Sequence, residues 1–513
     1  MAITRRFFIG GAAAFGAFGG LRLVGAPNFR RDGRPNLRFG VVSDIHIRYV
    51  DRSGKEAQGW GSNATFRRAL EWFRAQNVDA VVIAGDMADY GLTDDLEAVV
   101  QAWQDVFPNG RYPDGRPVEK VFIYGNHDFH GYLYGNAVEK RFPDEKERVK
   151  HVLRADLKGN WRKFFHEDYS RLYAKEIKGY RFIAQHWDDG TGMETRYGWG
   201  EGHLGEGLDA YFKAHGKAID PSRPFFYVQH PHLKDTCYGS WAWGHDNGGA
   251  TRALSSYPNA IALSGHSHYS LTDERSVWQG AFTSVGTASL LYTGLPFDER
   301  APGGQENAGA SGKDAWRYNA AKLSPMLWRD DCRQGALWSV YDDCIVIRRR
   351  EMLSGLDVGD DWVMPLPAAE SKPFAFAERA RKISAPRFAD GAKLEVERTK
   401  ASNRGGKSPD GKESVPSVEK DAYRVSIPPV APDESARAFE FEVVAESKGG
   451  EKRTKFVMVE GFNHALTHKR AGKKTSCAFA LDELPKDEVR FVVTPMNCFH
   501  GRGASLASEW IVV

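Results

Sequence analysis

Five short apolar runs, each ending abruptly in aspartate, asparagine or histidine, constrain the fold of this chain more than any other feature. A run of this length that is followed at once by polar residues predicts a buried strand delivering side chains at its C-terminal edge. Five such ends supply what a metal centre at the edge of a sheet needs. The runs and their ends are 39–42 before Asp44 and His46, 80–84 before Gly85, Asp86 and Asp89, 121–124 before Gly125, Asn126, His127 and Asp128, 224–229 before His230, Pro231 and His232, and 261–264 before Gly265, His266 and His268.

Helices are expected between the first strands. The apolar residues of segment 66–73 recur at positions i, i+3, i+4 and i+7, which predicts an amphipathic helix. Asn63 is placed to cap this helix, and residues 94–103 supply a second one. Strand, helix, strand is the opening unit of an α/β fold. Further strands are expected at 182–186, 335–341 and 344–349.

The last part of the chain, from about residue 383, changes character. Phe439, Phe441 and Val443 alternate with glutamates, which is the period of a half-buried strand. Turn residues separate seven such strand candidates, so we expect a small all-β sandwich of the immunoglobulin or fibronectin type III kind. The candidates are 393–397, 423–427, 439–443, 455–459, 476–480, 489–493 and 509–513.

Length and composition bound the number of domains and the kinds of partner. A chain of 513 residues suggests two or three domains. We expect an export signal at 1–30, a first domain at 36–356, a connector at 357–382 and the sandwich at 383–513. The formal net charge is only +3, whereas a nucleic-acid-binding protein normally shows a basic face. No nucleic-acid partner is therefore expected, and the oligomeric state stays open.

The N-terminus has the order of an export signal. Thr4-Arg5-Arg6-Phe7-Phe8-Ile9 precedes a Gly/Ala-rich apolar stretch, and the paired arginines indicate twin-arginine export. Arg22 interrupts the stretch, which disfavours a stable membrane span. Val24-Gly25-Ala26 has the small residues of a cleavage site, but Pro27 follows directly, so a retained anchor also stays open. The expected location is the periplasm or the cell envelope.

The cysteines indicate neither a structural zinc site nor a disulfide framework. There are five of them, widely spaced and without a CxxC pair. Cys477 and Cys498 fall on neighbouring predicted strands. A disulfide formed after export and two buried thiols are both compatible with this pattern.

The strand ends supply too many ligands for one tetrahedral ion. Two ions that share a bridging carboxylate fit better. Imidazole and carboxylate ligands without thiolates favour Fe, Mn or Zn over Ca, which prefers oxygen ligands alone. The seven candidate ligands are Asp44, His46, Asp86, Asn126, His230, His266 and His268.

In their order along the chain, these strand ends resemble the motif set of the calcineurin-like metallophosphoesterases. The motifs are Asp44-x-His46, Gly85-Asp86-x-x-Asp89, Gly125-Asn126-His127-Asp128, a strand-end histidine and Gly265-His266-x-His268. The resemblance covers about residues 36–350. It implies two facing β-sheets flanked by helices, and it leaves the signal and the terminal sandwich outside.

The resemblance also implies a role for each site residue. Asp44, His46 and His268 would hold one metal ion, Asn126, His230 and His266 the other, and Asp86 would bridge them. A hydroxide between the ions would attack phosphorus in line. His127 would donate a proton to the leaving group or stabilise the transition state, with Asp89 fixing its tautomer.

Three departures from the family pattern concern specificity and one ligand. Tyr90 and Asp128 stand where the protein serine/threonine phosphatase branch has arginine and glutamate, which argues against phosphoprotein substrates. The fourth motif reads His230-Pro231-His232 instead of His-x-Pro. His230 is the expected ligand, and His232 is the alternative.

The leading hypothesis is an exported, dinuclear-metal phosphoesterase acting on small-molecule phosphomonoesters or phosphodiesters. A nuclease of the same fold is a second hypothesis, disfavoured by the weak net charge of +3. A third is a surface-binding protein with a vestigial phosphoesterase domain. Because such decay removes ligands and none is missing from the motifs, this third hypothesis ranks below the first.

Overall fold

The computed structural model describes residues 33–48, 55, 61–133, 136–188, 202–238, 245–293, 332–403, 405–407, 413–433 and 436–513. The expected export signal at 1–30 lies outside the described residues. Within these ranges, none of the helices combines the length and the apolar composition that crossing a bilayer requires.

The first sheet has six strands in the order β12-β11-β10-β1-β2-β3. Strands β1, β2 and β3 are parallel, and β10 runs antiparallel to β1. All five residues of β2 are buried, as expected of a continuous apolar run inside a covered sheet. The bounds are β1 Leu37–Val42, β2 Ala80–Ala84, β3 Glu119–Ile123, β10 Gln334–Val340, β11 Cys344–Glu351 and β12 Trp362–Pro365.

The second sheet also has six strands, in the order β4-β5-β6-β7-β9-β8. Its inner strands β5, β6, β7 and β9 are parallel. The strand predicted at 182–186 is β5, which pairs with β6, the first of the two motif-bearing strands of this sheet. The bounds are β4 Leu172–Ile177, β5 Tyr180–Gln185, β6 Phe225–Val228, β7 Ala260–Ser264, β8 Val277–Gln279 and β9 Thr283–Gly286.

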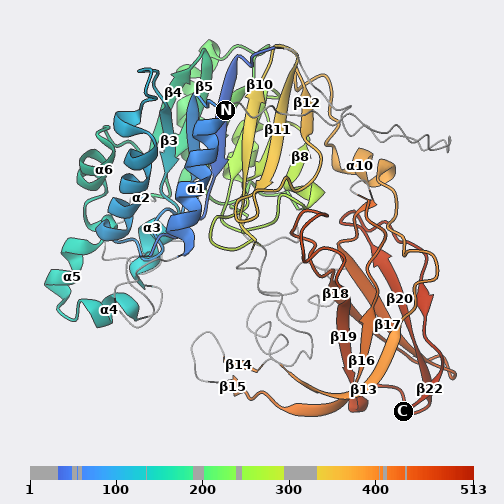
Figure 1. The fold of residues 1–513 in the computed structure, drawn as a ribbon. Coiled ribbons are helices and arrows are strands. Elements are labelled where there is room, and N and C mark those ends of the chain that lie inside the picture. The colour runs from blue at the N-terminus through green and yellow to red at the C-terminus, as the bar shows by residue number, and fades with distance from the viewer. Residues whose placement is uncertain are drawn as a thin grey trace, which may run out of the picture.

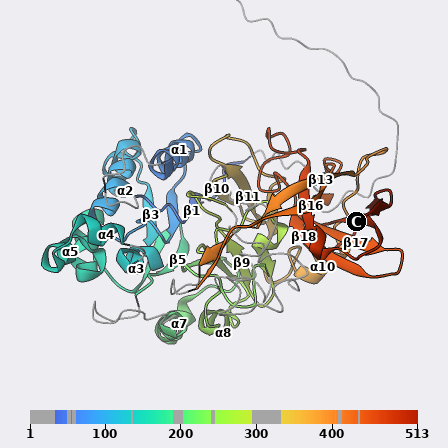
Figure 2. The ribbon, with the colours of Figure 1, turned by 90° about the horizontal axis from the view of Figure 1, so that it is seen from below.

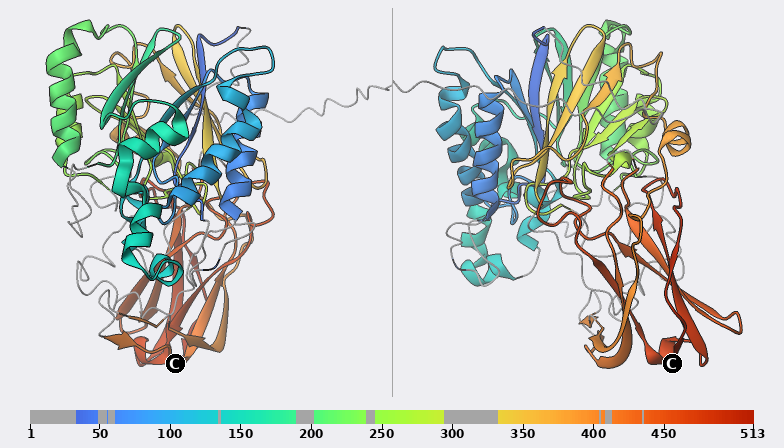
Figure 3. Two further views of the ribbon diagram at one scale, coloured as in Figure 1. Left: turned by 90° about the vertical axis from the view of Figure 1, so that its left-hand side faces the viewer. Right: turned by 45° about the vertical axis from the view of Figure 1, so that its right-hand side comes forward.

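The two sheets face each other, and helices cover their outer faces (Figure 3). The ring of Phe39 on β1 lies 5.3 Å from that of Phe182 and 5.0 Å from that of Phe226, both on the second sheet. Helices α1, α2 and α6 pack on the first sheet, and α7 and α8 cover the second sheet on the opposite side (Figure 2). We call this unit the two-sheet body. The helices are α1 Gly61–Ala75, α2 Thr93–Val106, α3 Asn126–His130, α4 Ala137–Arg141, α5 Glu145–His151, α6 Leu157–Phe165, α7 Gly202–His215, α8 Gly249–Leu254 and α10 Phe376–Lys382.

The C-terminal part is an all-β sandwich that lies beside the two-sheet body (Figure 1). One sheet has the order β13-β16-β19, and the other β18-β17-β20-β21, with β22 paired to β20. Val425, Phe441, Phe479 and Phe491 fill the core between them. Each of the seven predicted strands corresponds to an observed one. The bounds are β13 Glu395–Ser402, β14 Gly406–Lys407, β15 Ser414–Val415, β16 Glu419–Ile427, β17 Glu440–Ser447, β18 Lys452–Met458, β19 Thr475–Ala480, β20 Glu488–Met496, β21 Leu506–Ala507 and β22 Ile511–Val512.

Two further expectations concern the connector and the cysteines. The segment 357–382, expected to be a connector, adds β12 to the first sheet by pairing with β11 and also contains α10. Cys477 and Cys498 are buried and joined in no disulfide, as are the other three cysteines. The structure therefore has two buried thiols at Cys477 and Cys498, and not a disulfide.

Candidate metal centre

The strand ends of both sheets bring all seven candidate ligands to one place. Asp44 and His46 follow β1, Asp86 follows β2, and the remaining ligands follow β3, β6 and β7. These strands are parallel within each sheet, so their C-terminal ends lie at one edge. Each of the seven side chains belongs to a residue that is at most 7% exposed. The seven are Asp44, His46, Asp86, Asn126, His230, His266 and His268.

The backbone at these ends is held in an uncommon conformation. Five of the seven residues have φ between 48° and 71°, the left-handed region that residues other than glycine rarely adopt. Such strain costs about 1–3 kcal/mol per residue and persists only where the surroundings enforce it. The surrounding structure therefore holds the backbone of these strand ends in a conformation that sets the direction of their side chains. The five are Asp44, His46, Asp86, His266 and His268.

The glycines of the motifs let these ends approach each other. A Cβ atom at Gly125 would lie 2.2 Å from Oδ1 of Asp86. A Cβ atom at Gly85, whose φ is +93°, would lie 2.3 Å from Nδ1 of His230. Both distances are far shorter than van der Waals contact, so these positions require glycine.

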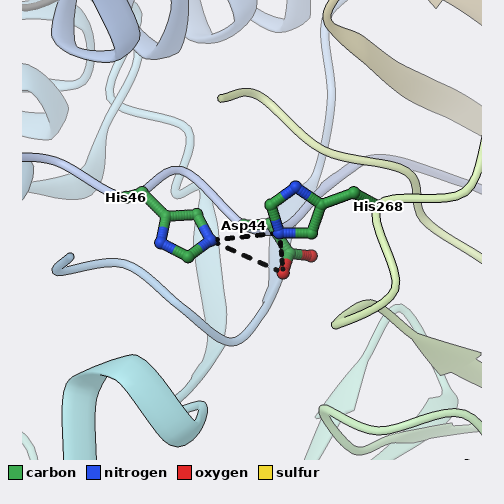
Figure 4. A group of neighbouring side chains, drawn as sticks. All are labelled: Asp44, His46 and His268. Atoms are coloured by element: carbon green, nitrogen blue, oxygen red, sulfur yellow. Dashed lines mark hydrogen bonds and ion pairs between the residues drawn. The ribbon is translucent and has the colours of Figure 1, made fainter. Parts of the chain in front are cut away.

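The first metal position consists of Asp44, His46 and His268 (Figure 4). Nε2 of His268 lies 3.1 Å from Oδ1 of Asp44, and Nε2 of His46 lies 3.8 Å from the same oxygen. The two Nε2 atoms are 3.2 Å apart. Atoms that ligate one ion at about 2.0–2.3 Å are no more than about 4.6 Å apart. All three distances fit a shared ion.

The second metal position consists of Asp86, His230 and His266, whose donor atoms all lie within 4.8 Å of one another. Nε2 of His230 is 3.1 Å from Oδ2 of Asp86 and 3.0 Å from Oδ1 of Asn126. Asp86 also lies 3.6 Å from Nε2 of His46 in the first position. Its carboxylate is therefore placed to bridge two ions.

The hydrogen bonds behind the histidines fix which ring nitrogen faces the centre. Nδ1 of His46 donates to Oδ1 of Asp89 (3.0 Å), Nδ1 of His230 to the carbonyl of Ala84 (2.7 Å), and Nδ1 of His268 to the carbonyl of Tyr292 (3.1 Å). In the neutral ring, each bond places the lone pair on Nε2, which points inward. Metal-ligating histidines are usually oriented in this way, so the donor set fits a pair of ions.

Residues 37–270 match the family model described as calcineurin-like phosphoesterase. The two-sheet body has the metallophosphoesterase fold. The sandwich follows it along the chain as a separate all-β unit. No curated protein matches the sequence.

Several solved structures are similar to this chain. A dimetal phosphatase from Danio rerio is 13% identical, with 65% of this chain and 99% of that chain covered and a TM-score of 0.36. A purple acid phosphatase from yellow lupin is 15% identical, with 64% and 54% covered and a TM-score of 0.35. A phosphopantetheinyl hydrolase from Mycobacterium tuberculosis is 12% identical, with 54% and 93% covered and a TM-score of 0.28.

Protons on the histidines balance the carboxylate charges of the candidate metal centre. Burial opposes ionisation of Asp44, but His268 holds the pKa of its carboxyl well below the usual range. Burial also opposes a charge on the histidines, yet the neighbouring carboxylates of Asp44 and Asp89 raise the pKa of His46 to about 10. The charge of Asp86 raises the pKa of His230 to about 9 in the same way. Both rings must lose a proton to become ligands.

Metal affinity is therefore expected to rise with pH. Below about pH 9 an ion must displace a proton from His46 or His230, so proton release accompanies binding. The expected slope between pH 6 and 8 is up to about tenfold per pH unit for each ion that displaces one proton. Zinc titration calorimetry in buffers of different ionisation enthalpy measures the protons released. Equal heats in all buffers and a pH-independent affinity would contradict this protonation state.

His127 lies at the open side of the site. Its side chain is 27% exposed, against 3% for His46. Its ring packs edge-on against His46 at 4.4 Å, and its main-chain N–H donates to Oδ1 of Asp86 (2.8 Å). His127 also forms a potential three-residue metal group with His46 and Asp86. Geometry alone therefore allows either a proton donor or a ligand here.

Asp89 contacts His127 through its main chain. The Asp89 carbonyl accepts from Nδ1 of His127 at 2.8 Å, whereas the Asp89 carboxylate lies 3.4 Å from that nitrogen. The carboxylate accepts from Nδ1 of His46 and from Nε of Arg48 (2.6 Å). Asp89 therefore orients the metal position as well as the outer histidine.

Asp128 has a structural role that the motif comparison did not predict. Its fully buried carboxylate accepts from the main-chain N–H groups of Gly125 (2.8 Å), Ala88 (2.7 Å) and Met87 (3.1 Å). Burial, with the charge of Asp86, raises its pKa to about 7. It joins the ligand-bearing loops after β2 and β3. Its place beside His127 in the motif was the only sequence signal for this role.

Two other histidines near the strand ends face away from the donor groups. Nδ1 of His232 lies 2.8 Å from Oγ of Ser264, and Nε2 lies 2.5 Å from Oγ of Ser267. His232 therefore stabilises the His266-Ser267-His268 turn through its contacts with Ser264 and Ser267. His186 is fully buried, and its Nδ1 accepts from the N–H of Tyr124 (3.0 Å).

Replacing each histidine of the fourth motif in turn distinguishes the metal ligand from the residue that stabilises the neighbouring turn. His230→Ala removes a donor from the second position and is expected to reduce bound metal to about one ion per chain. His232→Ala is expected to retain both ions while lowering the melting temperature, because buried hydrogen bonds are lost. Elemental analysis and thermal unfolding measure both effects. Loss of metal only from the His232 variant would reverse the assignment.

Proposed function

We propose that this protein is a phosphoesterase that uses two metal ions to hydrolyse phosphomonoesters or phosphodiesters of small molecules. The observation that carries the proposal is the pair of adjacent donor groups with oriented histidines in both, since Asp86 of the second group lies 3.6 Å from Nε2 of His46 in the first. The absence of thiolates among the donors favours Fe, Mn or Zn. The ions, when bound, would supply an activated water as nucleophile and stabilise the attacking and leaving oxygens of an in-line displacement.

The residues of the chain itself supply negative charge beside the ions and a proton for the leaving group. Asp44 and Asp86 bring two negative charges that balance the ions, and the buried walls of the site exclude water from the ligands. His127 is the group on the open side, where it reaches a substrate oxygen. We assign it the transfer of a proton from Nε2 to the leaving group, with Nδ1 held by the carbonyl of Asp89.

Export to the periplasm or cell envelope is part of the proposal. It rests on the N-terminal Arg5-Arg6 pair and the Gly/Ala-rich stretch behind it. A fusion of the first 30 residues or so to a reporter would be exported through the twin-arginine route, and the same fusion carrying Arg5→Lys and Arg6→Lys would not. Export of both fusions would refute the assignment of the route.

Hydrolysis of p-nitrophenyl phosphate and bis-p-nitrophenyl phosphate tests the function. Protein stripped of metal is expected to be inactive, and added Mn, Zn or Fe to restore turnover on at least one ester. The preferred ester distinguishes a monoesterase from a diesterase. Bound metal without turnover on any phosphoester would favour the surface-binding alternative. Plasmid cleavage that disappears in His127→Ala would favour a nuclease.

A further inference from the structure

The sandwich lies against the two-sheet body (Figure 1), and residues on both sides of the contact are buried. Arg275, in the short turn before β8, is fully buried and pairs with Asp273 at 2.7 Å. Its guanidinium lies 4.6 Å from the ring centre of Phe439 in the sandwich. Arg379 of α10 similarly lies 5.3 Å from the ring centre of Phe499. These two contacts between a cation and an aromatic ring join the two units.

Asn463 extends this interface toward the metal centre. It lies in the turn between β18 and β19 of the sandwich and has 0% exposed surface. Its Nδ2 donates to the carbonyl of Thr293 (3.2 Å). Its own main-chain carbonyl accepts from Nε2 of Gln334 (2.7 Å) and Oγ1 of Thr272 (3.2 Å). All three partners belong to the two-sheet body.

The segment that Asn463 holds supports the first metal position. We call residues 289–293 the support segment. Oγ of Ser289 and the N–H of Leu291 both donate to the carbonyl of Asp44 (3.1 Å each). The carbonyl of Tyr292 accepts from Nδ1 of His268 (3.1 Å). Two of the three residues in the first position are therefore oriented by the support segment, and its last residue is bonded to Asn463.

Gln334 provides a second link between Asn463 and the residues that follow His268. Oε1 of Gln334 accepts from the N–H of Leu271 (2.7 Å) and from Oγ of Ser270 (3.2 Å). These residues follow His268 by three and two positions. Nε2 of the same Gln334 side chain donates to the carbonyl of Asn463 (2.7 Å) and also to Oγ1 of Thr272 (3.1 Å), so the sandwich supplies the shorter of these two bonds.

We propose that the C-terminal sandwich completes the support of the metal centre, with Asn463 as a positioning residue for the ligands Asp44 and His268. The sandwich then acts as more than a spacer, since it supplies a donor to the carbonyl of Thr293 and an acceptor to the amide of Gln334. This inference rests on the proposed function only in requiring that the site bind metal. Removing a group that bonds a metal ligand directly typically weakens metal binding about 10- to 100-fold. Asn463 acts one residue further out, so we expect a loss at the lower end of this range.

Zinc titration of full-length protein by calorimetry tests the proposal without substrate. In Asn463→Ala and Asn463→Asp, one of the two zinc affinities is expected to fall by about tenfold while the other stays within about twofold. The aspartate variant keeps the size and main chain of the residue but cannot donate to the carbonyl of Thr293. It therefore tests the loss of this hydrogen bond if the alanine variant does not fold.

Asn497→Ala is the matched control. Asn497 is also a buried asparagine in a sandwich loop, with 1% exposed surface, and its side chain bonds Ser384, Phe499 and Gly501. This variant is expected to lower the melting temperature without changing either zinc affinity. Unchanged zinc affinities in both Asn463 variants would overturn the positioning role. Absence of zinc binding in the unmodified protein would instead refute the proposed function, and this inference with it.

Discussion

Asp86→Asn is expected to cost the protein both metal ions and nearly all phosphoesterase activity. Asp86 is 1% exposed and belongs to donor groups on both sides of the centre. The amide removes the one negative charge that both ions would share, while it keeps the size of the side chain. Elemental analysis of purified protein and turnover of p-nitrophenyl phosphate measure the two losses.

Asp246→Asn is the control for this change. Asp246 is likewise a buried carboxylate, with 5% exposed surface, and it accepts from Gln229 and from the N–H groups of Lys234 and Gly248. It belongs to none of the donor groups found among the described residues. We expect it to affect stability and to leave the metal content unchanged. An Asp86→Asn protein that still holds two ions would contradict the bridging role.

His127→Ala is expected to retain both ions and to lower turnover by roughly 10²-fold or more, the usual contribution of a general acid. The loss should depend on the leaving group. An alkyl phosphate needs a proton on its departing oxygen more than a nitrophenyl phosphate does, because nitrophenolate is a stable anion. The alkyl ester is therefore expected to show the larger loss.

His151 offers a matched control for His127, since its side chain on α5 is 29% exposed against 27% for His127. His151→Ala is expected to leave turnover unchanged. If His127→Ala lost a metal ion, His127 would be a ligand, as its grouping with His46 and Asp86 also allows. An equal loss on both esters would argue against proton donation.

The strands that carry the site could be predicted from the sequence because their chemistry is local. A buried strand must be apolar along its whole length, so the five apolar runs located β1, β2, β3, β6 and β7 to within two residues. The polar residues that follow mark where each strand leaves the core. The motif glycines were visible too, although their closeness to Asp86 and His230 was not.

The supports of the site could not be predicted in the same way. His232 and His230 stand two residues apart with the same flanking proline, and only the fold shows that His232 faces Ser264 and Ser267. The carbonyls of Ala84 and Tyr292 orient ligands through the main chain, which carries no residue-specific signal. Asn463 is 195 residues beyond His268 along the chain, so its position depends on how two domains pack.

The number of metal ions per chain tests the central claim most directly. The measurement is elemental analysis of protein purified without chelator and then supplied with Mn, Zn or Fe. The two donor groups, Asp44-His46-His268 and Asp86-His230-His266, predict two ions per chain. No bound metal under any of these conditions would contradict the account, and the strand-end carboxylates and histidines would then serve only to hold the loops together.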